Sequence, residues 1–486
     1  MAQLPQWVLL QRSIWFAALV LTLAEPHSSL AQLIPDTSLG THSSTISTNG
    51  LIDTVNGGVR TGGNLFHSFL EFNVGTGRSL YFNDPGVTNI LTRVTGVNPS
   101  TINGRLGVNG NANLFLLNPN GILFGAGASL DVRGSFTATT AAAVKFSDGS
   151  EFSATNPTVP NLLTISVPVG LQRGIQQPSA TIVNRGTLST GQDLTLAGDR
   201  LDLQGQLQAG GNLTLQATDT VHIRDTFTEP FLAQAGGDLT VQGDRGIDIL
   251  ALNHSTWTAF QSGGNLSLVS DGVISGDARF ASQRNFEVRP ITQELATFIS
   301  LYDPIITSAG DVNLALNYTG ASLLVEAGGN IRVQGILTIT TPDTAAPFVG
   351  DDAILNTRPG LILRSGQTTR RYGTNSGTVT GSSTGFGIVP APGITLNRRV
   401  NVANGGVVRL TTGGTGDIRT QQIDVAAGEI TVNSGGSINT NGRRVDTSTS
   451  NGNGGTIRLM QQAMFLPGIY LPLVMTFLLM GARSQS

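Results

Sequence analysis

Apolar residues along this chain come in short runs with alternating polar positions, and Gly, Asn or Pro ends most of these runs. The clearest example lies within residues 111–125. A run rich in Leu and Phe, typical of a buried strand, stops at Asn118-Pro119-Asn120-Gly121, and apolar residues resume at Ile122–Phe124. The proline lacks an amide hydrogen and fixes φ, while the Asn-Gly pair tolerates positive φ. The pattern predicts two strands joined by a sharp corner, with an ordinary hairpin turn as an equal alternative.

A loose repeat begins at about residue 185 and joins a Gly corner to a Leu-x-Leu strand. Each of six copies carries Asn or Asp between the glycine and the first apolar residue, at Asp193, Asn212, Asp238, Asn265, Asp311 and Asn330. The intervals between these positions are 19, 26, 27, 46 and 19 residues, and we interpret the interval of 46 as two turns. A period of about 20 residues or slightly more is typical of coiled strands, whereas β-propeller blades run to about 40 to 50 residues.

The repeat predicts an all-β chain that folds as a right-handed parallel β-helix, a solenoid in which each coil stacks on the one before it. Alternation along a strand turns Leu213 and Leu215 inward and Thr214 outward. We expect Asn and Thr side chains at matching positions to form hydrogen-bonded ladders along the axis. Some 20 coils, at about 4.8 Å each, predict a rod on the order of 100 Å long.

The rhythm of the repeat divides the second part of the chain into regions. We assign β-helix repeats to residues 151–340 and again to residues 394–459. Between them, residues 341–393 lose the apolar alternation and contain Pro-rich and Gly/Ser/Thr-rich stretches. This composition predicts an irregular loop insertion that protrudes from the coils and is cut first by proteases.

The last 27 residues, 460–486, differ in composition from the coils and hold four of the five methionines. Residues 463–482 carry no charge, but Pro467 and Pro472 would break a spanning helix. Three interpretations stay open: a membrane anchor, a hydrophobic cap, or an end that is truncated or not native to the coil. The abrupt change in methionine content favours the last.

The first 31 residues have the pattern of a secretory signal peptide. Arg12 and the amino terminus supply positive charge, and Ile14–Ala24 is an apolar stretch of eleven residues. Small residues at Ser29 and Ala31 predict cleavage between Ala31 and Gln32. An uncleaved anchor is the alternative, but eleven apolar residues are too few to span a bilayer comfortably.

Composition narrows the classes of function. Charged residues are 12% of the chain, the net charge is −3, and Lys145 is the only lysine, which argues against nucleic-acid binding. The chain has no cysteine, so disulfides and thiolate chemistry are excluded. The 62 glycines, with many Thr, Asn and Ser residues, favour repeated turns over helices.

The candidate chemistry is sparse. The histidines of the mature chain, His42, His67, His222 and His254, have no metal-ligand spacing, so we expect each to be solvated or packed. Asp351-Asp352 is a carboxylate pair in a predicted loop, and such pairs usually form a solvated face. It matters only because some β-helices are polysaccharide lyases or hydrolases with surface carboxylates. We predict no enzyme, no cofactor and no metal, and keep an extracellular polysaccharide-active enzyme as the alternative.

Several phrases of the sequence resemble a known family. Residues 111–125, together with Leu130–Phe136, resemble the second hallmark motif of the filamentous haemagglutinin N-terminal domain, in the version common in cyanobacteria. Asn64–Phe69 and Ile90–Val94 are similar to further phrases of that family. One departure occurs where typical members carry an Asn-Pro-Asn-Leu motif, because this chain has Asn83-Asp84-Pro85-Gly86. The resemblance covers about residues 33–459.

The resemblance implies a two-partner-secretion exoprotein with its secretion domain at residues 32–150. Such a protein crosses the inner membrane by the general export route and the outer membrane through a dedicated partner, a β-barrel transporter with periplasmic domains that bind the N-terminal module. It then acts outside the cell or on its surface as an adhesin or in aggregation and biofilm, with carbohydrate or other cells as the ligand.

The resemblance also points to a secretion site. We predict that Asn118, Pro119, Asn120, Gly121 and Ile122 serve secretion by holding a corner that keeps the N-terminal coils presentable to the partner. A purely structural corner carries equal weight, since the same residues can do both.

Overall fold

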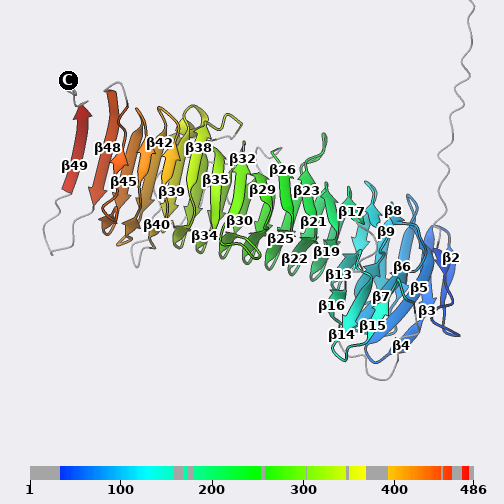
Figure 1. Cartoon of the computed structure of the whole chain (residues 1–486). Coiled ribbons are helices and arrows are strands. Elements are labelled where there is room, and N and C mark those ends of the chain that lie inside the picture. The colour runs from blue at the N-terminus through cyan, green and yellow to red at the C-terminus, as the bar shows by residue number, and fades with distance from the viewer. Residues whose placement is uncertain are drawn as a thin grey trace, which may run out of the picture.

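The computed structural model describes residues 33–157, 168–172, 180–252, 258–302, 304–345, 348, 350–367, 392–449, 453–461 and 473–480. The strands stack side by side into one elongated body, wider at its N-terminal end (Figure 1). Within these residues the one helix is a short 3₁₀ helix, η1 (Gly350–Asn356), and no helix is long and apolar enough to cross a membrane. The predicted signal peptide and its cleavage position, Ala31 and Gln32, lie outside the described residues.

Two parallel sheets form two sides of the solenoid. Within the described residues the first sheet has 16 strands: β1 (Leu33–Pro35), β4 (Val59–Thr61), β5 (Asn64–Phe72), β7 (Asn89–Val94), β10 (Asn113–Leu117), β13 (Phe136–Thr139), β19 (Leu194–Gly198), β22 (Leu213–Ala217), β25 (Leu239–Gly243), β28 (Leu266–Val269), β31 (Phe286–Arg289), β34 (Val312–Leu314), β37 (Ile331–Val333), β40 (Ile394–Leu396), β43 (Ile418–Arg419) and β46 (Ile438–Asn439). The second sheet, again counted over the described residues, has 13 strands: β8 (Ser100–Ile102), β11 (Ile122–Phe124), β17 (Thr181–Asn184), β20 (Arg200–Leu203), β23 (Thr220–Arg224), β26 (Gly246–Leu250), β29 (Val273–Asp277), β32 (Ala296–Ser300), β35 (Leu316–Ala321), β38 (Leu337–Thr341), β41 (Val400–Val402), β44 (Ile423–Val425) and β47 (Val445–Asp446).

A third sheet closes the solenoid, and a small fourth sheet lies outside it. The third contains β2 (Ser44–Asn49), β3 (Ile52–Gly57), β6 (Ser79–Asn83), β9 (Arg105–Asn109), β12 (Ser129–Asp131), β18 (Thr187–Thr190), β21 (Gln206–Ala209), β24 (Leu232–Ala235), β27 (Phe260–Ser262), β30 (Arg279–Ser282), β33 (Ile305–Ser308), β36 (Leu323–Ala327), β39 (Gly360–Ser365), β42 (Val407–Thr412), β45 (Glu429–Ser434), β48 (Asn453–Gln461) and β49 (Leu473–Met480). The fourth contains β14 (Ala143–Phe146), β15 (Glu151–Ser153) and β16 (Pro168–Gln172), all paired antiparallel.

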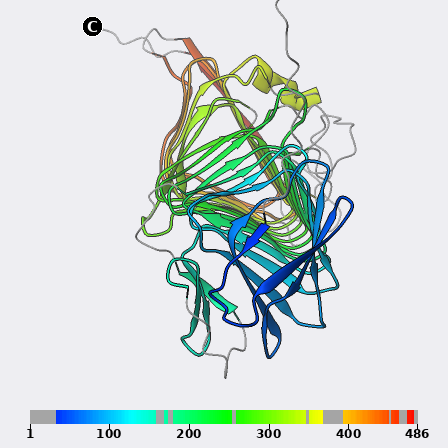
Figure 2. The same cartoon turned by 90° about the vertical axis from the view of Figure 1, so that its right-hand side faces the viewer.

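Each regular coil visits the three sheets in the same order, as β19, β20 and β21 do. Equivalent strands of successive coils pair in parallel, so that Leu194 lies beside Leu213 and Leu213 beside Leu239. Antiparallel pairing in the solenoid occurs only near its ends within the described residues, for example between β2 and β3 and between β48 and β49. Viewed end-on, the coils superpose around a common interior (Figure 2). The predicted parallel β-helix is confirmed.

The core is one continuous column of side chains inside the coils. It extends from Val55 in the N-terminal coils to Ile457 in β48. In β22, Leu213 and Leu215 are fully buried and Thr214 is half-buried on the outer face, as the alternation predicts. Burying a Leu side chain contributes about 1.5 to 3 kcal/mol, and the repeat adds such residues in every coil.

A ladder of polar side chains runs along one corner of the coils. The Asp193 carboxylate accepts the Asn212 amide hydrogen at 2.7 Å, and the Asn212 side chain accepts that of Asp238 at 2.8 Å. The members linked in this way are Asn64, Asn89, Asn113, Ser135, Asp193, Asn212, Asp238, Asn265, Asn285, Asp311 and Asn330. Asn285 divides the interval of 46 residues, which confirms that it holds two turns.

The ladder explains the glycine that directly precedes most of the Asn and Asp residues of the repeat. A Cβ on Gly237 would lie 2.4 Å from the Asn212 side-chain oxygen, and one on Gly264 would lie 2.1 Å from that of Asp238. These distances are far inside van der Waals contact, so any larger residue would displace the ladder. The Gly-Asn/Asp pairing in the sequence is therefore the signature of this corner.

The number of coils corrects one prediction. From β5 to β46 the first sheet places fourteen strands in the column of coils over the described residues, where we expected some 20 coils. At about 4.8 Å per coil the rod is roughly 65 Å long. The estimate was too high because some coils carry insertions. Phe136 pairs with Leu194, and Ile331 pairs with Ile394, so those two steps use far more residues than a period.

The predicted loop insertion at 341–393 also needs correction. Its residues 360–365 form β39, a fully buried strand of the third sheet that pairs with β36 and β42. Leu361 and Leu363 face the main core, and Ile362 faces outward against Leu355 of η1. The apolar run Leu361-Ile362-Leu363 is buried on both faces and shows no alternation, which is why the pattern missed it. Residues 368–391 lie outside the described part.

The carboxylates of the predicted loop differ from the expectation as well. Asp352 is fully buried and forms an ion pair with Arg364, whose guanidinium also contacts Glu326 at 3.1 Å. Asp351 is exposed, and its carbonyl oxygen accepts a hydrogen bond from Arg409. The pair is not a solvated face, because η1 packs onto the third sheet and buries Asp352.

Candidate functional site

The predicted motif Asn118–Ile122 forms the corner between β10 on the first sheet and β11 on the second. The strand–corner–strand prediction is confirmed, and the hairpin alternative is wrong, because β10 and β11 belong to different sheets and each pairs with strands of neighbouring coils. Asn118 is fully buried, while Pro119 and Asn120 are half-buried.

The two asparagine side chains of the motif bind the coil below. Asn118 Nδ2 donates to the Asn98 carbonyl oxygen and to Ser100 Oγ, both at 3.0 Å, and its Oδ1 accepts the Asn120 amide hydrogen at 2.9 Å. Asn120 Nδ2 donates to the Gly96 carbonyl oxygen at 2.8 Å. The amide groups of the motif therefore hold residues 96–100 in place and do not point freely into solvent.

Gly121 and Ile122 complete the corner. Gly121 has φ of +117°, a conformation that side-chain-bearing residues rarely adopt, and a Cβ there would meet the Thr181 carbonyl oxygen at 3.0 Å. Ile122 points into the main core and is 1% exposed. The backbone freedom predicted for this glycine is confirmed. A role in secretion stays a prediction.

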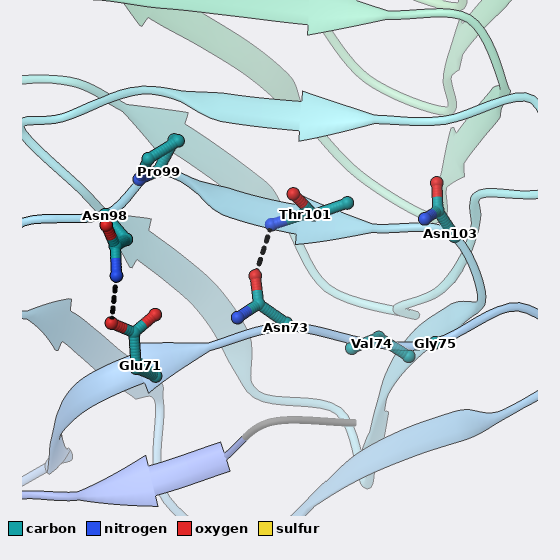
Figure 3. A pocket seen from close by; sticks show the side chains of 8 residues that line it. All are labelled: Glu71, Asn73, Val74, Gly75, Asn98, Pro99, Thr101 and Asn103. Atoms are coloured by element: carbon teal, nitrogen blue, oxygen red, sulfur yellow. Dashed lines mark hydrogen bonds between the residues drawn. The ribbon is translucent and has the colours of Figure 1, made fainter. Parts of the chain in front are cut away.

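A cleft lies beside this corner, because a Cβ on Gly121 would lie 3.7 Å from Pro99, one of the residues that line it. Figure 3 shows the lining. Its volume is about 370 Å³, and its lining residues are Glu71, Asn73, Val74, Gly75, Asn98, Pro99, Thr101 and Asn103. Asn98 Nδ2 donates to Glu71 Oε1 at 2.5 Å, and the Thr101 amide donates to Asn73 Oδ1 at 2.7 Å. The sequence analysis missed the cleft, because its asparagines come from two different coils and are no more conspicuous than the many asparagines elsewhere.

The departure from the first family motif has a structural role of its own. The Asp84 carboxylate accepts amide hydrogens from Gly86 and Val87 and, from the next coil, Asn111 and Ala112. Burial raises the pKa of Asp84, but the four backbone N–H groups outweigh it and hold that pKa below its ordinary value. Asp84 thus fastens the first corner to the start of the strand that leads into Asn118.

A second core fastens the small fourth sheet to the N-terminal coils. Arg93, fully buried on the outer face of β7, lies 4.5 Å above the Phe152 ring and donates to the Ser153 carbonyl oxygen at 2.8 Å. Its Nε also donates to Ser68 Oγ, which in turn donates to Asp36. Burial lowers the pKa of Arg93 to about 10, and the Asp36 carboxylate opposes that shift. The sequence offered no signal for this network.

The histidines are packed or solvated where the structure describes them. His67 is fully buried in β5, with Nδ1 2.9 Å from Ser44 Oγ, and burial lowers its pKa to about 3. His42 is exposed, and His222 lies between Asp202 and Asp248 on the outer face of the second sheet. His254 lies outside the described residues. Within the described ranges, no three His, Asp or Glu side chains are grouped so as to hold a metal ion.

Comparison with known proteins gives a relative in sequence and two similar solved structures. The chain is 26% identical over 173 residues to the heme/hemopexin-binding protein of Haemophilus influenzae, a match that covers 35% of this chain and 18% of that relative. The solved HMW1 secretion domain of Haemophilus influenzae is 14% identical, with 86% of this chain and 98% of that structure covered and a TM-score of 0.32. The solved filamentous hemagglutinin secretion domain is 19% identical to this chain. The match covers 62% of this chain and 99% of that structure, with a TM-score of 0.32.

The family itself is identified by a match to the model of the TPS secretion domain, which covers residues 31–275. The match contains the corner at Asn118–Ile122, the cleft beside it and the coils up to β29, and it extends past the boundary predicted at residue 150. The chain therefore belongs to the TPS secretion domain family, the secretion module of two-partner-secretion exoproteins.

Proposed function

We propose that this chain is the exported member of a two-partner secretion pair. A dedicated outer-membrane β-barrel transporter carries it out of the periplasm, and its N-terminal coils are the part that the transporter recognises. The observation that carries this proposal is the family match over residues 31–275, which includes the fixed corner at Asn118–Ile122. Residues 1–31 act as the signal peptide, with cleavage between Ala31 and Gln32.

Outside the cell, the protein acts as an adhesin or in aggregation and biofilm formation, either released or held at the surface. A rod of stacked coils supports this role because it presents long, regular outer faces at a distance from its N-terminal end (Figure 1). Its partner on other surfaces is carbohydrate or other cells.

The polysaccharide-active enzyme gains no support from the carboxylates that suggested it. Asp352 is bound to Arg364 in a buried ion pair, while Asp351 is exposed. The two carboxylates therefore do not face a common surface on which a sugar could be cleaved by an acid and a base.

The test is the location of the protein in cells with and without its partner transporter. We expect the protein in the medium or on the cell surface when the transporter is present, and folded protein retained in the periplasm when the transporter gene is deleted. Equal amounts outside the cell in both strains would refute the proposal. Amino-terminal sequencing of the exported protein checks that it begins at Gln32.

A further inference from the structure

The cleft beside the motif lies where the second sheet stops. In the described chain β8 is the last strand of this sheet, and beyond it only Val74 continues the pairing, through a single bridge to Ile102. Val74 donates its amide hydrogen to the Thr101 carbonyl oxygen and accepts that of Asn103. The coil that precedes β8 therefore does not supply a full strand to cover it.

A side chain takes the place of the missing strand. The Thr101 amide, which would donate to a neighbouring strand in a complete sheet, donates to the Asn73 side chain. Asn98 adds a further amide group along the same edge, and Glu71 adds a carboxylate that accepts from it (Figure 3). A row of groups that both donate and accept hydrogen bonds suits the backbone of an extended peptide.

Two exposed apolar residues directly precede lining residues of the cleft in the sequence, and we call them its rim. Val97 is 84% exposed and directly precedes Asn98, and Leu70 is 45% exposed and directly precedes Glu71. The Leu70 carbonyl oxygen would lie 2.0 Å from a Cβ on Gly96, so the two rim segments are in close contact. A mostly polar lining with exposed apolar residues next to it suits a strand whose side chains alternate. None of the eight lining residues is aromatic, which disfavours a sugar, since sugars bind through stacking on rings.

The motif supports this cleft from behind. Asn118 binds the Asn98 carbonyl oxygen and Ser100 Oγ, and Asn120 binds the Gly96 carbonyl oxygen, so both motif asparagines fix the segment that carries Val97, Asn98 and Pro99. The Asn118 side chain is buried and engaged at both its Nδ2 and its Oδ1, and the Asn120 Nδ2 is engaged as well. Asn118 therefore acts through the cleft wall that it holds, and Asn120 supports the same wall.

We propose that the cleft between residues 71–75 and 97–103 is the docking site for an extended segment of the transporter's periplasmic domains, and that the motif acts by shaping it. This inference rests on the proposed function. It changes the role of Asn118 and Asn120 from contact residues to positioning residues, and it assigns the contact to Val97, Asn98 and their neighbours across the cleft.

The test compares two exposed apolar residues at the same end of the rod. Val97→Arg places a charge on the rim, and Leu51→Arg does so in the β2–β3 turn, where Leu51 is 63% exposed and away from the cleft lining. In cells that carry the transporter, we expect Val97→Arg to lower the ratio of secreted to periplasmic protein at least fivefold at an unchanged melting temperature. Leu51→Arg should be secreted like the wild type.

A second measurement uses the absence of cysteine from the chain. Val97→Cys and Leu51→Cys each provide a unique attachment point for a thiol-linked photocrosslinker on the full-length protein. Mixed with the purified periplasmic domains of the partner transporter, the Val97 variant should crosslink in several-fold excess over the Leu51 variant. This measurement also decides the matter if Val97→Arg proves unstable.

Three outcomes would overturn the inference: normal secretion of Val97→Arg, equal crosslinking from the two positions, or binding of soluble oligosaccharides that Val97→Arg abolishes while secretion is unaffected. Failure of the proposed function looks different, because the wild-type protein would then leave the cell without its transporter.

Discussion

The N-terminal coils and the regular coils from β19 to β37 reach the same fold by different means. The regular coils repeat one device, a Gly next to an Asn or Asp that accepts an amide hydrogen from the next coil, as Asn212 does for Asp238. The N-terminal coils continue the ladder through Asn64, Asn89 and Asn113, but they also depend on contacts that occur only once. Examples are the Asp84 carboxylate, which binds amides of two coils, and the network of Arg93. A repeated device survives the loss of one copy, whereas a unique contact has no substitute nearby.

The largest effect is expected at the motif glycine. Gly121→Val places a β-branched residue at φ of +117°, with its Cβ 3.0 Å from the Thr181 carbonyl oxygen. We expect the N-terminal coils to misfold, with loss of the cooperative thermal transition and of secretion. Gly405→Val is the control, because Gly405 also has positive φ but has open space around its Cβ position, and it should cost less.

A smaller loss is expected from Arg93→Met. Removing a buried cation that holds Ser68 and the Ser153 carbonyl leaves those groups without their donor, and breaking buried networks of this kind costs about 3 to 5 kcal/mol. Arg289→Met removes an exposed partner of Glu287 in a regular coil and should change stability by about 1 kcal/mol or less. Urea unfolding of both variants measures the difference, and similar midpoints would remove the contrast between the two regions.

The sequence predicted the regular coils far better than the N-terminal ones, because the regular coils repeat one device and the N-terminal coils depend on contacts that occur once. The position of Asp193, Asn212 and Asp238 recurs with the period of the coil, so the pattern alone revealed the strands, the corner and even the two turns hidden in the long interval. Arg93 and Asp36 come together only after folding, and no spacing in the sequence links them.

The candidate site shows the same limit. The corner at Asn118–Ile122 was predictable, because Pro119 and Gly121 restrict or free the backbone locally. The cleft beside it was not, since Asn73 and Asn98 are brought together by the stacking of two coils and by the end of a sheet. β39 was missed for a further reason, because a strand buried on both faces carries no alternation.

The two regions should also differ in their response to acid. The pKa of His67 in the folded protein, lowered to about 3 by burial, lies below its ordinary value of about 6.5, so the unfolded chain binds the proton more readily. The stability that neutral His67 contributes is complete above pH 6.5 and is lost as the pH falls towards 3, at about 1.4 kcal/mol per pH unit.

Hydrogen–deuterium exchange between pH 7.5 and 4.5 measures this along the chain. Protection should fall first in the coils around β5, and His67→Phe should flatten the pH dependence there, because it removes the titrating group from the same space between Phe69 and Phe82. Equal loss of protection in the regular coils would show that acid acts on the whole rod and not on this histidine.

The variant with the smallest expected loss of stability, Asn120→Ala, best separates a structural role of the corner from a role in secretion. Asn120→Ala removes the bond to the Gly96 carbonyl oxygen, and Asn212→Ala removes a ladder bond of similar length in a regular coil. Each loses a hydrogen bond at a partly exposed corner, so each should cost about 1 kcal/mol. If the corner were only scaffold, secretion would follow stability and the two variants would leave the cell equally well. We expect them to differ, because only Asn120 fixes the segment that carries Val97 and Asn98 beside the cleft. The measurement is the amount of secreted and periplasmic protein, together with the melting temperature, for each variant. A well-folded Asn120→Ala protein that stays in the periplasm, while Asn212→Ala is secreted, would show that the motif serves secretion through the surface it shapes.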